Sequence, residues 1–169
     1  HRERYQFAIN KIQKRCGEIK PTVLDCACGV GYGTMMIADQ VARHAVGMDI
    51  AEDAIEVANR CYKKDNSDFR VCDLGNEESW NAALTDEVFG AIVSIETIEH
   101  VEDAEALIKR YAERTDFLVG SVPNEVFVPW KKEQHPFHFR HYTRQQFTDL
   151  LGDYGFKITC WATQYDKIP

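Results

Sequence analysis

The sequence lacks any long apolar run. No stretch of its 169 residues approaches the roughly 18–20 consecutive apolar residues that cross a bilayer, so we expect no membrane span. No apolar core follows the first five residues, and we therefore expect no signal peptide in this chain.

Basic residues are also in deficit. Lys and Arg total 20 against 27 Asp and Glu, which gives a formal net charge of −7. An acidic chain lacks the broad electrostatic attraction on which nonspecific nucleic-acid binding depends. RNA is therefore a less favoured partner than a small molecule, although a local basic patch is still compatible with this composition.

Paired cysteines are almost absent. Of the six cysteines only Cys26 and Cys28 lie close together in the sequence, and no second pair completes a zinc-binding pattern. Four of the six lie in or beside apolar runs, which is typical of buried, reduced thiols. We therefore expect a cytoplasmic protein, and the length and the 44% hydrophobic content suit a single domain over residues 1–169.

Helical and strand-like patterns alternate along the chain. Apolar periodicity predicts helices at about 2–18, 33–42, 52–64, 77–84, 103–112 and 143–154. Apolar runs predict strands at 22–27, 45–49, 69–73, 88–95, 117–122 and 156–162. This alternation predicts an α/β fold with a doubly wound, mostly parallel, Rossmann-like sheet. The aromatic-rich segment 123–142 is long for a loop in a compact domain, which favours a functional role.

A glycine-rich turn follows the first predicted strand. Gly29, Gly31 and Gly33 alternate after Asp25, and glycines let a backbone turn sharply and approach a ligand closely. The amide groups of the following helix would point at that ligand. The same pattern also occurs in ordinary strand–helix turns, so the turn alone is a weak signal.

Two further acids follow the next two predicted strands. Asp49 could accept hydrogen bonds from ribose hydroxyls and Asp73 from an adenine amino group, although either could instead cap a helix. The glycine spacing is G-x-G-x-G, not the dinucleotide motif G-x-G-x-x-G, and Asp25 would repel a pyrophosphate. A nucleoside with an ammonium group, such as S-adenosyl-L-methionine, fits this pattern better.

These segments resemble the class I S-adenosylmethionine-dependent methyltransferases. The likeness runs from Val23 to Gly33 and includes Gly47-Met48-Asp49 and Asp73-Leu74. It implies a seven-stranded sheet, of which this chain supplies one strand after its last helix. It also implies that the cofactor contacts Asp25, Ala27, Gly29, Gly31, Asp49, Ile50, Asp73, Leu74 and Ile95. Tyr5 of the first predicted helix could close over the methionine end of the cofactor, or it could simply pack in the core.

A polar group follows the fourth predicted strand. If the chain turns helical there, Glu96, Glu99 and His100 lie on one face. His100 could then act as a general base with Glu96 orienting it, or all three could bind a divalent cation. A polar helix start with no chemistry is the alternative.

The same cluster resembles those of metal-assisted O-methyltransferases acting on small-RNA 3′ ends or on ubiquinone precursors. That likeness implies Glu96, Glu99, His100 and His138 as ligands of Mg²⁺ or another divalent cation. The whole pattern resembles a bacterial and phage glycan-associated group more closely, with His141 replacing a common acid. It implies O-methylation of a hydroxylated small molecule, sugar or glycolipid, with S-adenosyl-L-homocysteine as product. RNA 3′-end ribose methylation and a non-catalytic cofactor-binding module remain alternatives, and the oligomeric state is left open.

Overall fold

Five parallel strands form the centre of the fold. The computed structural model describes residues 1–164, and its strands are β1 (Thr22–Cys26), β2 (His44–Asp49), β3 (Ser67–Val71), β4 (Ala91–Ile95) and β5 (Leu118–Ser121). They lie in the order β3-β2-β1-β4-β5, and every neighbouring pair is parallel. The predicted doubly wound, Rossmann-like sheet is confirmed.

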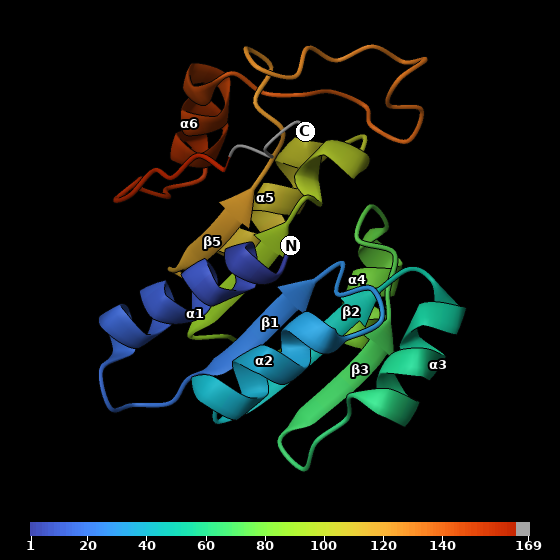
Figure 1. Cartoon of the computed structure of the whole chain (residues 1–169), viewed down its shortest axis with the longest axis vertical. Helices are drawn as coiled ribbons and strands as arrows, with labels where there is room; N and C mark the ends of the chain where they lie inside the picture. The colour runs from blue at the N-terminus through green and yellow to red at the C-terminus, as the bar shows by residue number, and fades with distance from the viewer. Residues whose placement is uncertain (165–169) are drawn as a thin grey trace.

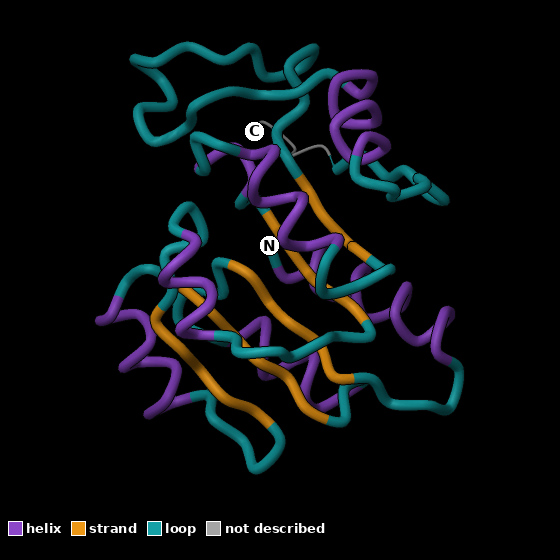
Figure 2. The backbone as a smooth tube through the Cα atoms, turned by 180° about the vertical axis from the view of Figure 1, so that it is seen from behind, coloured by secondary structure: helices purple, strands orange, loops and turns teal. Residues whose placement is uncertain are grey.

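Helices cover both faces of this sheet (Figures 1 and 2). They are α1 (Arg2–Cys16), α2 (Tyr32–Gln40), α3 (Glu52–Cys61), α4 (Glu77–Ala83), α5 (Ala104–Ala112) and α6 (Arg144–Asp153), with one 3-10 turn, η1 (Ile98–His100). Thr143 caps α6 through a reciprocal capping box with Gln146, so the predicted start of that helix is confirmed. None of the described helices has both the length and the apolar character needed to cross a bilayer.

Alternation along the strands divides the core into two main layers. Val23 of β1 packs with apolar residues of α1 and α2, whereas its neighbour Leu24 packs with those of α4, α5 and α6. β4 is completely buried and lies between β1 and β5, which agrees with its strongly apolar sequence. The sheet is therefore packed from both faces, and the acids Asp25 and Asp49 lie near the carboxyl ends of β1 and β2.

The order of the strands reverses between β1 and β4. In open α/β sheets ligands bind at such a switch point, outside the carboxyl ends of the strands. Cys26 pairs in register with Met48 of β2 and with Ser94 of β4, so these three strands end at one edge. Figure 1 shows the long segment 123–142 lying beyond the end of β5, next to this edge.

One predicted strand and several boundaries were wrong. Residues 156–162 form no strand, because Phe156 and Ile158 pack against the core near α6 without pairing with a neighbouring strand. β3 ends at Val71, so Asp73 lies in the turn beyond it. β4 begins only at Ala91, since Val88 is 71% exposed and lies outside the sheet.

Tyr5 fastens α1 to the start of α2. Its ring lies directly over Gly33, where an added Cβ would overlap three ring carbons. The ring also contacts Tyr32 edge to face, with the centroids 5.5 Å apart. Only glycine at position 33 therefore permits this close approach of the two helices.

We expect Gly33→Ala to lower the free energy of unfolding by about 1–3 kcal/mol, because the added methyl group must displace the buried Tyr5 ring. Gly152→Ala is the matched control, since Gly152 lies in α6 with open space around a Cβ and should be neutral or slightly stabilising. Urea unfolding of the three proteins measures the difference. Equal losses in both variants would contradict this packing.

Candidate functional site

Asp25 is a completely buried carboxyl group at the switch point. One oxygen accepts a hydrogen bond from the Tyr5 hydroxyl at 3.2 Å, and the other accepts one from the Thr34 hydroxyl at 2.6 Å. Burial raises the pKa of Asp25 to about 7, although these two hydrogen bonds oppose the shift. Asp25 thus links β1, α1 and α2 and is poised to change its charge near neutral pH.

The glycine-rich turn after β1 has an unusual backbone. Ala27, Gly29 and Gly31 all have positive φ, at 56°, 55° and 90°. A Cβ at Gly31 would lie 2.7 Å from both the Ala58 side chain and the Phe69 ring, so glycine is required there for space as well as conformation. A Cβ added at Gly29 would have nothing within 4 Å, which leaves this part of the backbone open to a ligand.

Asp49 ties this turn to the end of β2. Its Oδ2 accepts a hydrogen bond from the Gly29 amide at 2.8 Å, and its Oδ1 accepts one from the Ala51 amide at 3.0 Å. A carboxylate has further lone pairs, so ribose hydroxyls can still bind the same two oxygens. Asp49 therefore stabilises the glycine-rich turn and can still bind the ribose hydroxyls, as predicted.

The other predicted cofactor residues differ in exposure. Asp73 is exposed, and its Oδ1 accepts a hydrogen bond from the Gly75 amide at 2.9 Å. Ile50 is 64% exposed beside Asp49, whereas Leu74 and Ile95 are buried. These residues all follow or end strands of one edge, and their contacts with a cofactor stay predictions.

The predicted helical face after β4 does not form. Glu96 has a left-handed backbone with φ of 51°, and only Ile98–His100 makes a single 3-10 turn. The Glu96 Oε1 accepts a hydrogen bond from the Ser121 hydroxyl at 2.8 Å, and the Glu96 Oε2 lies 3.8 Å from the Arg4 guanidinium. Glu96 is therefore held by β5 and α1, and its role as a base or a metal ligand stays a prediction.

Glu99 is a fully buried acid with an unusual environment. Neither carboxylate oxygen has a hydrogen-bond partner among residues 1–164. Burial raises its pKa to about 8, and the nearby Glu96 carboxylate adds to this effect. A buried carboxylate without partners is costly, so it favours either protonation or a bound cation.

Three of the four predicted metal ligands meet around this acid. Glu99, His100 and His138 each offer a ligand atom within 4.8 Å of the others. Burial lowers the pKa of His138 to about 4, and the neighbouring His100 ring contributes to this shift. His138 is thus neutral near pH 7, which is the form that binds metals.

Main-chain bonds fasten the long loop to this cluster. The Phe139 amide donates to the Glu99 carbonyl at 2.8 Å, and the His100 Nδ1 lies 3.1 Å from the Phe137 carbonyl. Since a carbonyl only accepts, the His100 Nδ1 carries the proton and its Nε2 is left with a free lone pair. The loop thereby orients a predicted ligand.

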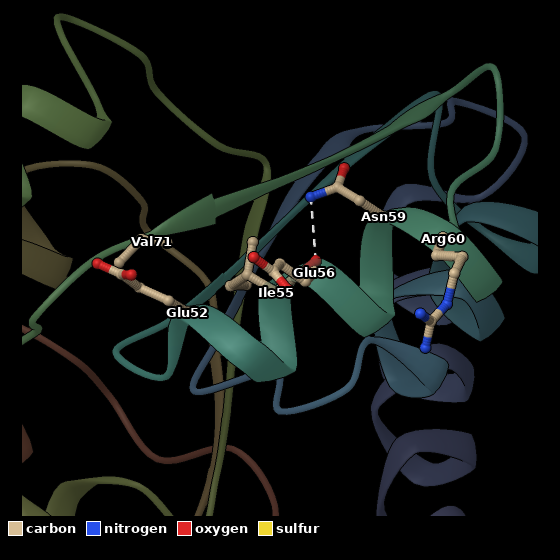
Figure 3. A pocket seen from close by; sticks show the side chains of 6 residues that line it. All are labelled: Glu52, Ile55, Glu56, Asn59, Arg60 and Val71. Atoms are coloured by element: carbon tan, nitrogen blue, oxygen red, sulfur yellow. Dashed lines mark hydrogen bonds between the residues drawn. The ribbon is translucent and has the colours of Figure 1, made fainter.

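A pocket of about 550 Å³ lies away from these residues, along α3 and the end of β3 (Figure 3). Glu52, Ile55, Glu56, Asn59, Arg60 and Val71 line it. It includes none of the residues predicted to bind a cofactor or a cation. The chemically distinctive groups therefore lie at the switch point and not in this groove.

Sequence reasoning missed several partners of the predicted residues. Thr34 and Ser121 give no sequence signal, because their importance depends on which strand ends lie together. The triplet spacing of His135, His138 and His141 was visible in the sequence, and the structure brings all three rings together.

Comparison with known proteins identifies the family. A family model described as a methyltransferase domain matches residues 23–115, which is more than half of the chain. The chain therefore belongs to the methyltransferase domain family. The matched segment contains the glycine-rich turn, Asp49 and the Glu99–His100 turn, and it ends before β5 and the long loop.

Two curated relatives are named as probable S-adenosylmethionine-dependent methyltransferases. A probable S-adenosylmethionine-dependent methyltransferase of Mycolicibacterium smegmatis is 27% identical over 160 residues, which are 92% of this chain and 58% of the relative. One of Mycobacterium tuberculosis is 29% identical over 159 residues, which are 90% of this chain and 54% of the relative. The chain thus spans little more than half the length of these relatives.

A solved structure supports the fold. Magnesium protoporphyrin IX methyltransferase from Synechocystis, crystallised with bound S-adenosylhomocysteine, superposes with a TM-score of 0.77 at 18% identity. The match covers all of this chain and 79% of that protein.

The buried Asp25 should make stability depend on pH. Its folded pKa of about 7 exceeds the value of about 4 in an unfolded chain, so the folded state binds more protons between these values. The free energy of unfolding should therefore fall as pH rises from about 4 to 7, by up to about 1.4 kcal/mol per pH unit from this group.

Asp25→Asn should lose that part of the slope, measured by urea unfolding between pH 4.5 and 7.5. Asp39→Asn, which changes an exposed acid on α2, should keep the slope of the unaltered chain. The same slope in all three proteins would show that Asp25 is ionised throughout.

Proposed function

We propose that this domain transfers a methyl group from S-adenosyl-L-methionine to a hydroxyl group of its acceptor. The observation that carries this proposal is the convergence of two sites on one sheet edge. Asp25, the glycine-rich turn and Asp49 form the first, and the buried Glu99 with His100 and His138 forms the second. The first suits the cofactor and the second suits the accepting oxygen.

The residues at the switch point fit an adenosyl sulfonium. Asp49 would accept hydrogen bonds from the ribose hydroxyls, and the exposed Asp73 would meet the adenine amino group. Asp25 would balance the charge of the amino-acid ammonium group, directly or through water, and its high pKa would fall on binding. When bound, S-adenosylmethionine supplies an electrophilic methyl group on sulfur.

The second site fits a divalent cation because both Glu99 oxygens are buried without partners among the described residues. Glu99, His100 and His138 would hold the ion, with Glu96 as a further candidate ligand. When bound, such an ion lowers the pKa of a coordinated hydroxyl group. Without an ion, the lone pair on the His100 Nε2 would let that ring act as the general base.

The overall transfer balances simply. The S–CH₃ bond breaks with its electron pair left on sulfur, and the O–CH₃ bond forms. The hydroxyl proton leaves to His100 or to water, so the products are S-adenosyl-L-homocysteine, a methyl ether and a proton. The chain's contribution is to hold the acceptor oxygen in line with the methyl group and to accept its proton.

The proposed acceptor is a hydroxylated small molecule, sugar or glycolipid. The loop beside the site exposes large apolar side chains, among them Phe137 at 78% and Val126 at 67%, which would suit an acceptor with an apolar part. The net charge of −7 disfavours the RNA alternative. A screen of polyols, glycolipids and RNA 3′ ends, read by production of S-adenosylhomocysteine, separates these acceptors.

A non-catalytic binding module is the second candidate function. This alternative rests on the fold alone, because the same fold can host binding as well as catalysis. Binding of S-adenosylhomocysteine without turnover across the whole acceptor panel would favour this alternative, whereas methyl transfer to any acceptor would exclude it.

We expect Asp49→Ala to weaken binding of S-adenosylhomocysteine by about 10- to 100-fold, because hydrogen bonds to a charged group contribute about 1.5–3 kcal/mol. Titration calorimetry measures the change, and circular dichroism checks that the variant is folded. Asp53→Ala removes an exposed acid of α3 and should leave the dissociation constant unchanged. An unchanged constant in Asp49→Ala would refute the ribose-binding role.

We expect Glu99→Gln to lower methyl transfer by roughly 100-fold or more and to abolish its response to added Mg²⁺ or Mn²⁺, because a ligand charge is lost. The binding of S-adenosylhomocysteine should stay the same. Glu102→Gln, an exposed acid just beyond the same turn, is the matched control. Full activity of the unaltered chain in excess chelator would refute a role for a divalent cation. His100 would then remain as the candidate general base.

A further inference from the structure

Four of the six histidines lie together beside the long loop. We call His100, His135, His138 and His141 the imidazole cluster. Their ring centroids are 4.4 Å apart for His100 and His138, and 4.7–5.1 Å apart within the other three. Only His100 and His138 belong to the cation site proposed above, so His135 and His141 need a separate explanation.

Hydrogen bonds fix which nitrogens of this cluster are free. The His141 Nδ1 lies 2.6 Å from the Val128 carbonyl, which only accepts, so this nitrogen carries the proton. The His141 Nε2 is therefore a lone pair, and it lies 2.7 Å from the His138 Nδ1. Neutral His138 therefore donates a hydrogen bond through Nδ1 to the His141 Nε2. The His138 Nε2 then carries a free lone pair.

A second group of possible metal ligands also includes His138. His135, His138 and His141 each offer a nitrogen within 4.8 Å of the others. His141 is held from behind by the Val128 carbonyl, with the Glu125 carboxylate 4.0 Å from its Nδ1. A carbonyl or carboxylate behind a ligating imidazole orients the ring and raises its basicity.

We propose that His135, His138 and His141 form a second cation site, which takes a transition-metal ion such as Zn²⁺. Three neutral imidazoles suit Zn²⁺ and similar ions, whereas Mg²⁺ prefers oxygen ligands. The ion replaces the proton between the His138 Nδ1 and the His141 Nε2, and that proton moves to the His138 Nε2. This site therefore differs from the Glu99 site in both its ligands and its preferred metal.

The two sites compete for His138. Both groups of ligands include His138, and its Nδ1 lies 2.7 Å from the His141 Nε2. A neutral ring offers one lone pair at a time, so one ion excludes the other. If the proposed function holds, Zn²⁺ at the three-histidine site withdraws a ligand from the Glu99 site and inhibits methyl transfer.

Calorimetric titration of the whole chain with ZnCl₂ tests the site itself. We expect one Zn²⁺ per chain, and we expect His135→Ala to weaken its binding at least about tenfold. Glu99→Gln should stay within about threefold of the unaltered chain. His44→Ala, which removes a remote histidine paired with Asp68, is the matched control and should also leave binding unchanged.

His135→Gln is a second variant that keeps a polar side chain in the loop, and thermal unfolding shows whether both position-135 variants are folded. Absence of Zn²⁺ binding, unchanged binding in folded His135→Ala and His135→Gln, or loss of binding in Glu99→Gln would each overturn the proposal. The titration needs neither cofactor nor acceptor, so a chain that binds Zn²⁺ as expected but transfers no methyl group would refute only the proposed function.

Discussion

The burial of the Asp25 carboxyl group between α1 and α2 is the constraint on which the rest of the site depends. Its two hydrogen bonds, from Tyr5 and Thr34, join the end of β1 to both helices. The Tyr5 ring leaves room only for glycine at position 33. The glycine-rich turn between Asp25 and Gly33 carries the open backbone of Gly29. A single polar group therefore positions the helix that shields the sheet and the turn that faces a ligand.

Much of the fold could be predicted from sequence because its elements have clear periodicities. The strongly apolar sequence of β4 agrees with its interior place between β1 and β5. The failure at 156–162 has a physical cause, since the alternation of Phe156 and Ile158 reflects packing on the core and not pairing in a sheet. The periodicity of apolar residues indicates which side chains are buried. A strand also needs a neighbouring strand whose backbone N–H and C=O groups are free to form hydrogen bonds with it.

The candidate site was predictable only in part, for the same reason. Acids at strand ends are visible in sequence, so Asp25 and Asp49 were expected at one edge, and they lie there. The left-handed backbone of Glu96 was not predictable, because it depends on the hydrogen bonds that its amide and carboxylate make with Ser121 of β5. The partners of a loop residue come from elements distant in sequence, and no local pattern encodes them.

The main-chain bond from Phe139 of the long segment 123–142 to Glu99 has a consequence for acceptor binding at this edge. This segment also completes the surroundings of the buried acid, so lifting it would separate His138 from Glu99 and take apart the proposed cation site. Under the proposed function, entry of a bulky acceptor and assembly of the ligands Glu99, His100 and His138 would therefore be coupled through this segment. The acceptor and the buried acid would then be linked by one backbone hydrogen bond, so a change at either would be felt at the other.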